Sequence, residues 1–156
     1  MKTTFNCVLV GALLAIATAV ASAADPVIGT WKLNLAKSTF SPGPAPKSQT
    51  RSYAESPQGI VLTTKTVAAD GKESTISLTF KDDGKPYAVT GSPDFDAVSV
   101  RRVNARTVKS TQTRAGAPVG SGVRTVSEDG KALTFEQKGT HVGGGKYDDV
   151  LVYDRE

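Results

Sequence analysis

Apolar and polar residues alternate along most of the chain after about residue 24. In the segment from Ser74 to Lys81, for example, Ile76, Leu78 and Phe80 share one face of an extended chain, and small polar residues share the other. A period of two residues predicts β-strands with one buried face, because a helix repeats every 3.6 residues. Thr, Val and Ser are abundant, as pleated strands prefer. The pattern therefore predicts an all-β protein with almost no helix.

Three copies of the tripeptide Asp-Gly-Lys separate alternating segments and begin at Asp70, Asp83 and Asp129. Asp-Gly accepts the positive φ angles of a type I′ turn, which joins two antiparallel strands in a hairpin. None of the three has the spacing of a calcium-binding loop. With these turns fixed, the sequence predicts ten strands, near residues 27–33, 47–55, 59–68, 73–82, 85–90, 95–103, 106–113, 119–127, 131–139 and 146–154.

Most connections between these strands are short, so we expect an antiparallel up-and-down meander. A closed barrel is the leading architecture, because an open sheet of ten strands accumulates twist and exposes two edges. A flattened β-sandwich is the alternative. One connection differs, because residues 34–46 carry prolines at 42, 44 and 46, which resist both helix and central strand. We expect a single helical turn within Leu35 to Phe40, followed by an extended segment that is either a lid or a plain crossover.

The N-terminal segment has the composition of a targeting signal. Lys2 precedes an apolar run from Val8 to Val20, and small residues follow up to Ala24. An apolar run of about 13 residues is shorter than the roughly 20 that span a bilayer, so we predict a cleaved signal peptide over residues 1–23. The mature chain, residues 24–156, would then be one periplasmic or secreted domain with no stable membrane anchor. It would also contain no disulfide, because the only cysteine is Cys7.

Charge and chemistry-bearing residues give little support to nucleic-acid binding or catalysis. Loss of Lys2 leaves 18 basic and 15 acidic residues, a net charge of 18 − 15 = +3, and the basic residues are scattered along the chain. His141 is the only histidine, and its glycine-rich segment lacks the P-loop spacing. One histidine and no cysteine provide neither a nucleophilic triad nor a usual zinc site. We expect no catalytic residue, metal or cofactor, and enzymatic activity stays an open question.

Both ends of the mature chain resemble the calycin group, which includes lipocalins and intracellular fatty-acid-binding proteins. The segment Gly29-Thr30-Trp31-Lys32-Leu33 is similar to their first strand, and Arg155 follows the last strand, where that group often places an arginine on the tryptophan. The resemblance implies a structural cation–π contact between Trp31 and Arg155. The chain departs from the fatty-acid-binding proteins because no helix pair follows the first strand and Tyr153-Asp154-Arg155 does not match their Arg-x-Tyr order. The resemblance is therefore to lipocalin-like exported bacterial proteins.

A barrel of this size is either filled by side chains or holds one small ligand. Small residues at many inward positions favour a cavity of roughly 300 Å³ or more for an apolar ligand. The alternative is a filled core in a structural or interaction protein that binds a partner through loops or a strand edge. The sequence does not specify the oligomeric state. Candidate ligand-binding residues are Tyr53, Leu62, Ile76, Leu78, Phe80, Tyr87, Arg102, Arg124 and Phe135, with Val89, Val100, Val123 and Leu133 as further wall residues.

Overall fold

The computed structural model describes residues 24–156, so the predicted signal peptide, residues 1–23, lies outside the described residues. The described chain confirms an all-β fold of ten strands, whose bounds lie within a few residues of those expected. A single turn of 3₁₀ helix at Leu35–Lys37 confirms the expected helical turn. The strands are β1 (Gly29–Leu33), β2 (Ser48–Ser56), β3 (Gly59–Val67), β4 (Glu73–Phe80), β5 (Asp83–Ala88), β6 (Ala97–Arg102), β7 (Thr107–Arg114), β8 (Ala117–Val126), β9 (Ala132–Thr140) and β10 (Lys146–Arg155).

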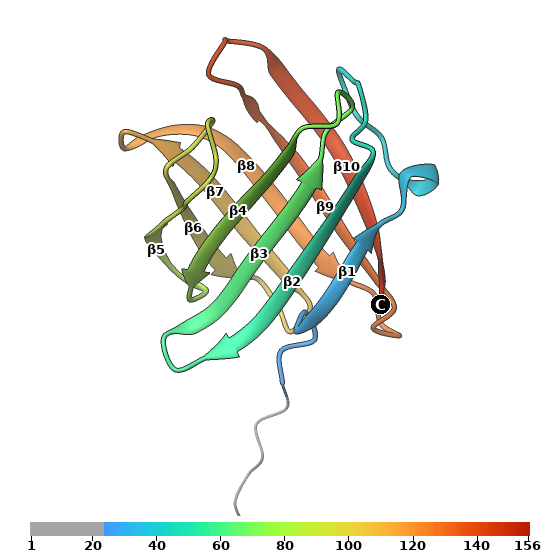
Figure 1. The fold of residues 1–156 in the computed structure, drawn as a ribbon. Helices are drawn as coiled ribbons and strands as arrows, with labels where there is room; N and C mark the ends of the chain where they lie inside the picture. Colours follow the sequence, from blue (N-terminus) through green and yellow to red (C-terminus); the bar gives the residue numbers. More distant parts are fainter. Residues whose placement is uncertain (1–23) are drawn as a thin grey trace, which may run out of the picture.

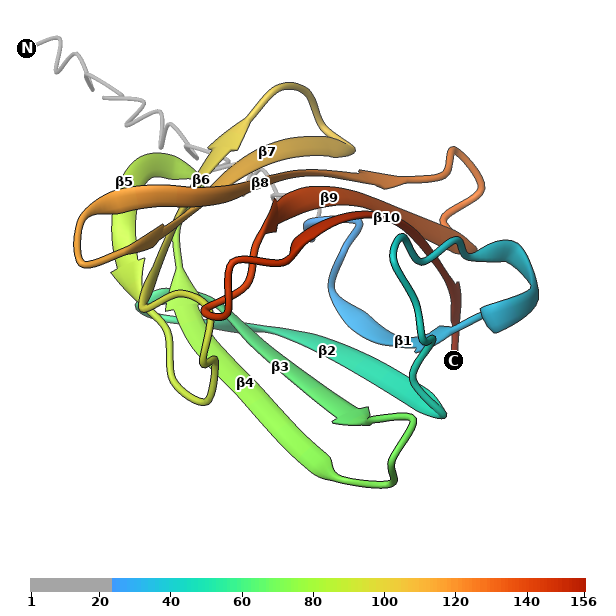
Figure 2. The same ribbon diagram turned by 90° about the horizontal axis from the view of Figure 1, so that it is seen from above.

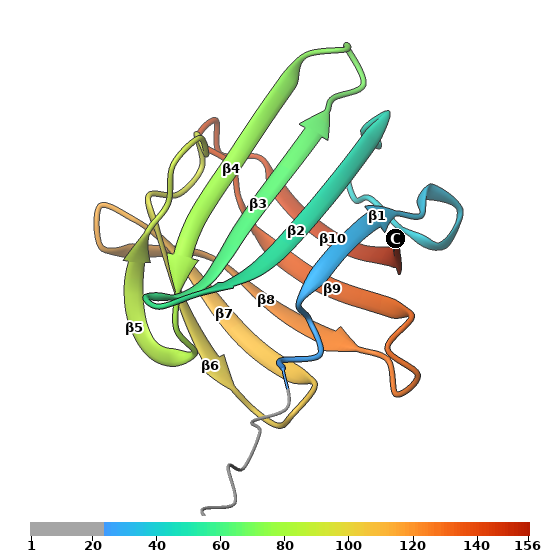
Figure 3. The ribbon, with the colours of Figure 1, turned by 60° about the horizontal axis from the view of Figure 1, so that its bottom comes forward.

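All ten strands belong to one antiparallel sheet, in the order β4-β3-β2-β1-β10-β9-β8-β7-β6-β5. The first strand, β1, pairs with both β2 and β10, so the N-terminal and C-terminal strands are neighbours in the sheet (Figure 1). The sheet curls until its edge strands β4 and β5 approach each other, where Ser77 and Thr90 form an isolated bridge (Figure 3). The protein is therefore a nearly closed barrel, which confirms the leading prediction over the sandwich.

Two of the three Asp-Gly-Lys turns close hairpins, but neither is the expected type I′ turn. The amide of Gly71 donates to the carbonyl of Ala68 at 2.9 Å, and the amide of Gly130 donates to that of Ser127 at 3.0 Å. Both glycines have positive φ, whereas no aspartate in the described residues does. A type I turn followed by a left-handed glycine needs only that one positive φ, so aspartate keeps an ordinary backbone conformation.

The third tripeptide does not form a hairpin at all. Asp83 and Gly84 begin β5, and β5 pairs with β6 rather than with the preceding strand β4. The prediction of a hairpin here is wrong because β4 and β5 are the two edges of the sheet. One local bond is nevertheless common to all three tripeptides, because the carboxylates of Asp70, Asp83 and Asp129 each accept from the backbone amide two residues further on, at 3.0 Å.

The proline-containing connection is a crossover that extends the barrel wall. The backbone of Thr39 exchanges two hydrogen bonds with Val150 of β10, at 2.8 and 3.0 Å. The amide of Asp148 donates to the carbonyl of Ser41 at 2.7 Å. The segment therefore takes over the place beside β10 where β1 has ended. These hydrogen bonds show the expected crossover.

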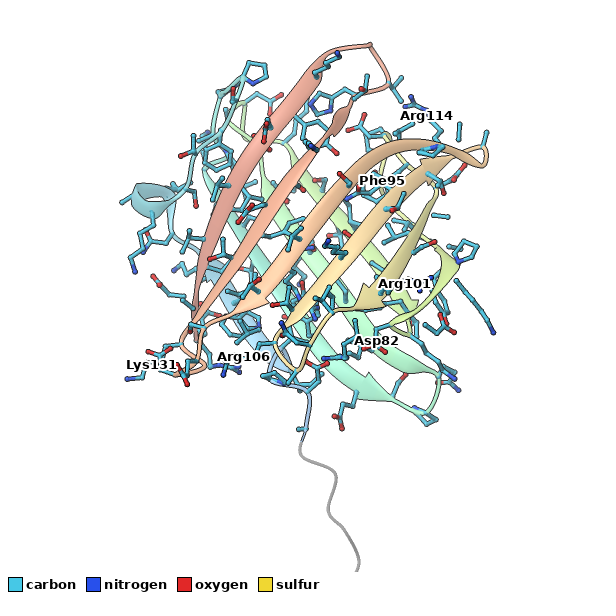
Figure 4. The ribbon with its side chains drawn as sticks, turned by 180° about the vertical axis from the view of Figure 1, so that it is seen from behind. Asp82, Phe95, Arg101, Arg106, Arg114 and Lys131 are labelled. Carbon is cyan, nitrogen blue, oxygen red and sulfur yellow. The ribbon has the colours of Figure 1, made fainter. Side chains whose placement is uncertain are left out.

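The closed end of the barrel is filled by apolar side chains. Trp31 and Leu133 have no exposed surface, and the Trp31 indole donates to the carbonyl of Val27 at 2.7 Å. Arg106 and Lys131 mark this end from outside in Figure 4, with Phe95 and Arg114 toward the other end. The packed layer forms a floor, and the interior above it is less densely filled. Its fully buried members are Val27, Trp31, Val126, Leu133 and Tyr153.

Candidate ligand-binding cavity

A cavity of about 250 Å³ lies inside the barrel above this floor. Its volume is slightly below the roughly 300 Å³ expected from sequence, and it suits one small ligand. Inward-facing residues of β2, β3, β4 and β6 to β10 form its wall, because side chains alternate between the two faces of each strand. Seven of the nine candidate residues lie in this wall, as does Val100; the seven are Tyr53, Leu62, Ile76, Leu78, Phe80, Arg124 and Phe135.

Tyr87 and Arg102 do not lie in the cavity wall. Tyr87 pairs with the wall residue Val98 and packs against the core, but the edge strand β5 contributes no side chain to the cavity, and the Tyr87 hydroxyl donates to the Asp83 carboxylate at 3.0 Å. Arg102 is the last residue of β6, and its guanidinium reaches the rim of the barrel. There it forms ion pairs with Asp25 and Asp82, and the Arg102 side chain is 34% exposed.

Three of the further wall residues also lie elsewhere. Val123 neighbours Arg124 on β8 and faces the opposite side of the sheet. Leu133 belongs to the floor beneath the cavity. Val89 follows the end of β5 and packs against the core without reaching the cavity wall.

Two arginines project into the cavity, and sequence reasoning found only Arg124. Arg51 lies on β2 between Gln49 and Tyr53, and all three side chains line the cavity. Their spacing of two residues was the signal for Arg51, because Tyr53 was already expected to face inward. Arg124 is 5% exposed. Protein surrounds Arg51 as well, and the accessible surface that it keeps faces the cavity.

Aromatic rings rather than carboxylates surround these two cations. Arg51 lies 4.6 Å from the ring centre of Phe135, and Arg124 lies 5.1 Å from that of Tyr53. Within residues 24–156 neither guanidinium forms an ion pair, and the Nε atoms of both are buried without a hydrogen-bond partner. Burial acts to lower the pKa of Arg51, but the phenol groups of Tyr53 and Tyr153 outweigh it and the pKa lies above its usual value.

The acidic side chains of the cavity wall are engaged elsewhere. Asp149 accepts from the amide of Ser41 at 3.0 Å and from the Gln137 side chain at 3.2 Å. Asp94 is held by the loop that contains His141. Neither carboxylate forms an ion pair with Arg51 or Arg124, so the two guanidinium groups lie in the interior without a direct anionic partner among the described residues, which is costly in a site of low dielectric constant.

Tyr153 anchors the lower part of the wall. Its hydroxyl donates to the side-chain oxygen of Gln49, whose nitrogen donates in turn to the hydroxyl of Thr66 at 2.8 Å. Burial raises the pKa of Tyr153 to about 12, although the nearby charge of Arg51 opposes this shift. The phenol is therefore a neutral hydrogen-bond donor at physiological pH.

The loop between β5 and β6 covers the open end of the barrel. Ser92, Pro93, Asp94 and Phe95 all line the cavity from this loop. The Asp94 carboxylate bonds to the imidazole Nδ1 of His141 and accepts from the amide of Val142, both at 2.8 Å. This contact joins the loop to the turn between β9 and β10 across the mouth of the barrel, which Figure 2 shows from above. This loop takes the position that a lid would occupy.

Residues 24–156 contain neither a cluster of metal-ligating side chains nor a membrane-spanning helix. No group of three or more His, Cys, Asp or Glu side chains there is arranged to hold a metal ion. None of the helical segments described is long and apolar enough to cross a bilayer.

Comparisons with known proteins support the fold. No protein-family model matches the chain, and no curated protein matches its sequence. Among solved structures, the chain is similar to zebrafish ileal bile acid-binding protein complexed with cholic acid, with a TM-score of 0.50 and 9% sequence identity. The match covers 84% of this chain and 99% of that one. At this identity the likeness shows the fold alone, a ten-stranded barrel of the calycin type.

Proposed function

We propose that the barrel binds a small amphipathic anion, with the acidic group held between Arg51 and Arg124 and the apolar part against the remaining wall. The unpaired charge of these two arginines is the observation that carries the proposal. A guanidinium offers several N–H donors in a fixed fork that matches a carboxylate, and burial makes such a pair strong. An anionic ligand would give the two guanidinium groups the direct ion-pair partner that neither wall carboxylate, Asp94 or Asp149, provides.

The apolar part of the ligand has a matching surface. Leu62, Ile76, Leu78 and Val100 line the cavity from β3, β4 and β6, whereas the arginines lie on β2 and β8. The fold likeness to a protein whose structure contains cholic acid is consistent with a small ligand in this position. The cavity also argues against the filled core that the interaction-protein hypothesis requires.

Calorimetric titration with decanoate and with decan-1-ol tests the proposal on delipidated protein. The two probes have the same chain length and differ in charge. We expect decanoate to bind at least tenfold more tightly than decanol, because only the carboxylate pairs with the arginines. Equal binding of both probes would contradict the anion site, and no binding of either would contradict the cavity as a ligand site.

Variants separate the two arginines from general charge effects. Arg51→Met and Arg124→Met each keep the chain length and apolar volume but remove the guanidinium, and we expect each to abolish the preference for decanoate. Arg102→Met removes one positive charge at the barrel rim, where the side chain pairs with Asp25 and Asp82. We expect this control to retain the preference.

We further propose that this binding takes place outside the cytoplasm. The proposal rests on the charged, apolar and small-residue regions of residues 1–24. Expression of the full chain in a bacterial host followed by intact-mass measurement tests it. A periplasmic or secreted product that begins at Ala24 is expected, and a cytoplasmic product of full mass would contradict it.

A further inference from the structure

The polar side chains of the cavity wall occupy one side of the barrel. The strands β2, β1, β10, β9, β8 and β7 are consecutive in the sheet and form one arc of the wall. Every charged or amide side chain that a strand contributes to the cavity comes from this arc. These residues are Gln49 and Arg51 on β2, Asp149 on β10, Gln137 on β9, Arg124 on β8 and Gln112 on β7.

The opposite arc, formed by β3, β4 and β6, is almost entirely apolar. It contributes aliphatic and aromatic side chains and one threonine, Thr64, which lies on β3 next to the polar strand β2. Val108, Phe135 and Leu151 add apolar surface to the polar arc, but no amide or charge crosses to the apolar one. The apolar wall residues are Leu62, Ile76, Leu78, Phe80, Val98 and Val100.

Three glutamines form a polar belt between the arginines and the mouth. On β2, Gln49 lies two residues from Arg51 in the direction of the mouth. On β9, Gln137 lies two residues nearer the mouth than Phe135, which pairs with Arg124. Gln112 is opposite Gly120, four residues from Arg124 along β8. At about 3.3 Å per residue, the belt lies roughly 7 to 13 Å from the arginines along the strands.

Gln112 differs from the other two glutamines in having an unused group. Gln49 bonds to Tyr153 and Thr66, and Gln137 bonds to Asp149. Gln112 is 5% exposed, and its side-chain oxygen has no hydrogen-bond partner among the described residues. Burying an amide oxygen without a donor is unfavourable. Because the terminal torsion of glutamine is soft, a small rotation turns this amide toward the cavity.

We infer that the natural ligand carries hydrogen-bonding groups along one side, roughly 7 to 13 Å from its anionic end, and that Gln112 determines specificity for them. The inference rests on the proposed anion site. A plain alkyl acid would leave the side-chain oxygen of Gln112 without a donor, whereas a hydroxylated acid supplies one. The ligand class is therefore a small acid with one polar and one apolar side.

Calorimetric titration with 10-hydroxydecanoate and with decanoate tests this inference, because the inference predicts which of the two acids binds more tightly. In an apolar cavity the added hydroxyl loses water without compensation, so decanoate binds more tightly. A polar belt reverses the order, and we expect wild-type protein to bind the hydroxy acid at least fivefold more tightly. Tighter or equal binding of decanoate would overturn the inference and leave the anion site intact. No binding of either acid would overturn the anion site itself, and the inference with it.

Gln112→Leu assigns the effect to one residue. The leucine has similar volume without the amide, so we expect it to weaken 10-hydroxydecanoate binding at least fivefold and to leave decanoate binding equal or tighter. Gln58→Leu, in the exposed turn between β2 and β3, is the matched control and should keep the wild-type order. An unchanged preference in Gln112→Leu, with a urea midpoint near that of wild type, would remove Gln112 from the specificity site.

Discussion

Arg155 connects the two ends of the described chain through three backbone carbonyls and one aromatic ring. Its guanidinium lies 4.1 Å from the Trp31 ring centre and donates to the carbonyls of Pro26, Ile28 and Gly130 at 2.5, 2.8 and 2.6 Å. These contacts tie the last strand to the segment before β1 and to the turn before β9. The contact inferred from resemblance is thus present, and both residues contribute to the fold without touching the cavity.

Arg155→Ala should lower the free energy of unfolding by about 2 kcal/mol, since each lost hydrogen bond and the cation–π contact contribute roughly 0.5–1.5 kcal/mol. The free energy of unfolding of Arg155→Lys should lie between those of wild type and Arg155→Ala, because one ammonium group cannot donate to all three carbonyls at once. Urea denaturation measures both, with Lys131→Ala as a nearby exposed control. An Arg155→Ala midpoint equal to that of wild type would show that the contacts are dispensable.

The buried phenol of Tyr153 should make stability fall at high pH. Burial raises its pKa to about 12, so the unfolded chain, with a phenol pKa near 10, loses its proton first. The stabilisation is therefore complete below about pH 10 and is lost as pH rises toward about 12, with a total on the order of 2 kcal/mol. Urea unfolding of wild type and Tyr153→Phe at several pH values should show the two stabilities converging over this range. Parallel curves would contradict the linkage.

At the scale of elements, the weakest part of the barrel is the seam between β4 and β5. Ser77 and Thr90 close it with two backbone hydrogen bonds, at 2.9 and 3.1 Å. Gly91 follows directly, with φ +82°, and a Cβ atom there would overlap the carbonyl oxygen of Thr75. The close approach of the β5–β6 loop to β4 therefore requires glycine, both for its backbone angle and for space.

Gly91→Ala should open this seam. We expect the free energy of unfolding to fall by about 2 kcal/mol or more, and hydrogen exchange at the Ser77 and Thr90 amides to accelerate. Gly116→Ala is the matched control, because its φ of +79° is similar but no atom lies within 4 Å of the added Cβ. That variant should lose only about 1 kcal/mol through backbone strain and leave exchange at the seam unchanged.

The elements were largely predictable because alternation and turn residues act locally. The period of two placed ten strands and most of the cavity wall, including Leu78 and Phe135. It failed where a long-range feature intervened. Tyr87 lies on the edge strand β5, which does not reach the cavity, the strand end carried Arg102 to the rim, and closure of the sheet left the Asp83 turn without a hairpin. No local pattern contains these features, since each depends on which strands become neighbours.

Arg51 was missed for a different reason. An arginine in an alternating strand is ordinarily assigned to the solvent face, because burial of an unpaired charge is unfavourable. The structure places it inward between Gln49 and Tyr53. Residues that break the rules of a stable core are expected at functional sites, so the failure of the rule at Arg51 is itself informative.

At the scale of the whole molecule, the two arginines that the proposed function requires in the cavity lower the free energy of unfolding. Without an anion, Arg51 and Arg124 place two cations without a direct ion-pair partner inside one barrel, within reach of the same Tyr53 ring. Each charge loses hydration on folding and gains contacts with aromatic rings and, for Arg51, with the phenol groups of Tyr53 and Tyr153, rather than an ion pair. The packed floor, which includes Trp31 and Tyr153, must therefore contribute enough stability to offset the cost of burying these two charges.

Replacement of these charges should therefore stabilise the empty protein while abolishing anion binding. We expect Arg124→Met to raise the free energy of unfolding by about 1–3 kcal/mol, as found when buried charges are replaced by apolar groups of similar volume. Decanoate should raise the melting temperature of wild type as its occupancy rises, and should raise that of the variant no more than decan-1-ol does. Thermal unfolding with and without decanoate measures both effects. A variant less stable than wild type would mean that Arg124 is a structural residue, because a charge kept for a ligand has no reason to stabilise the unliganded barrel.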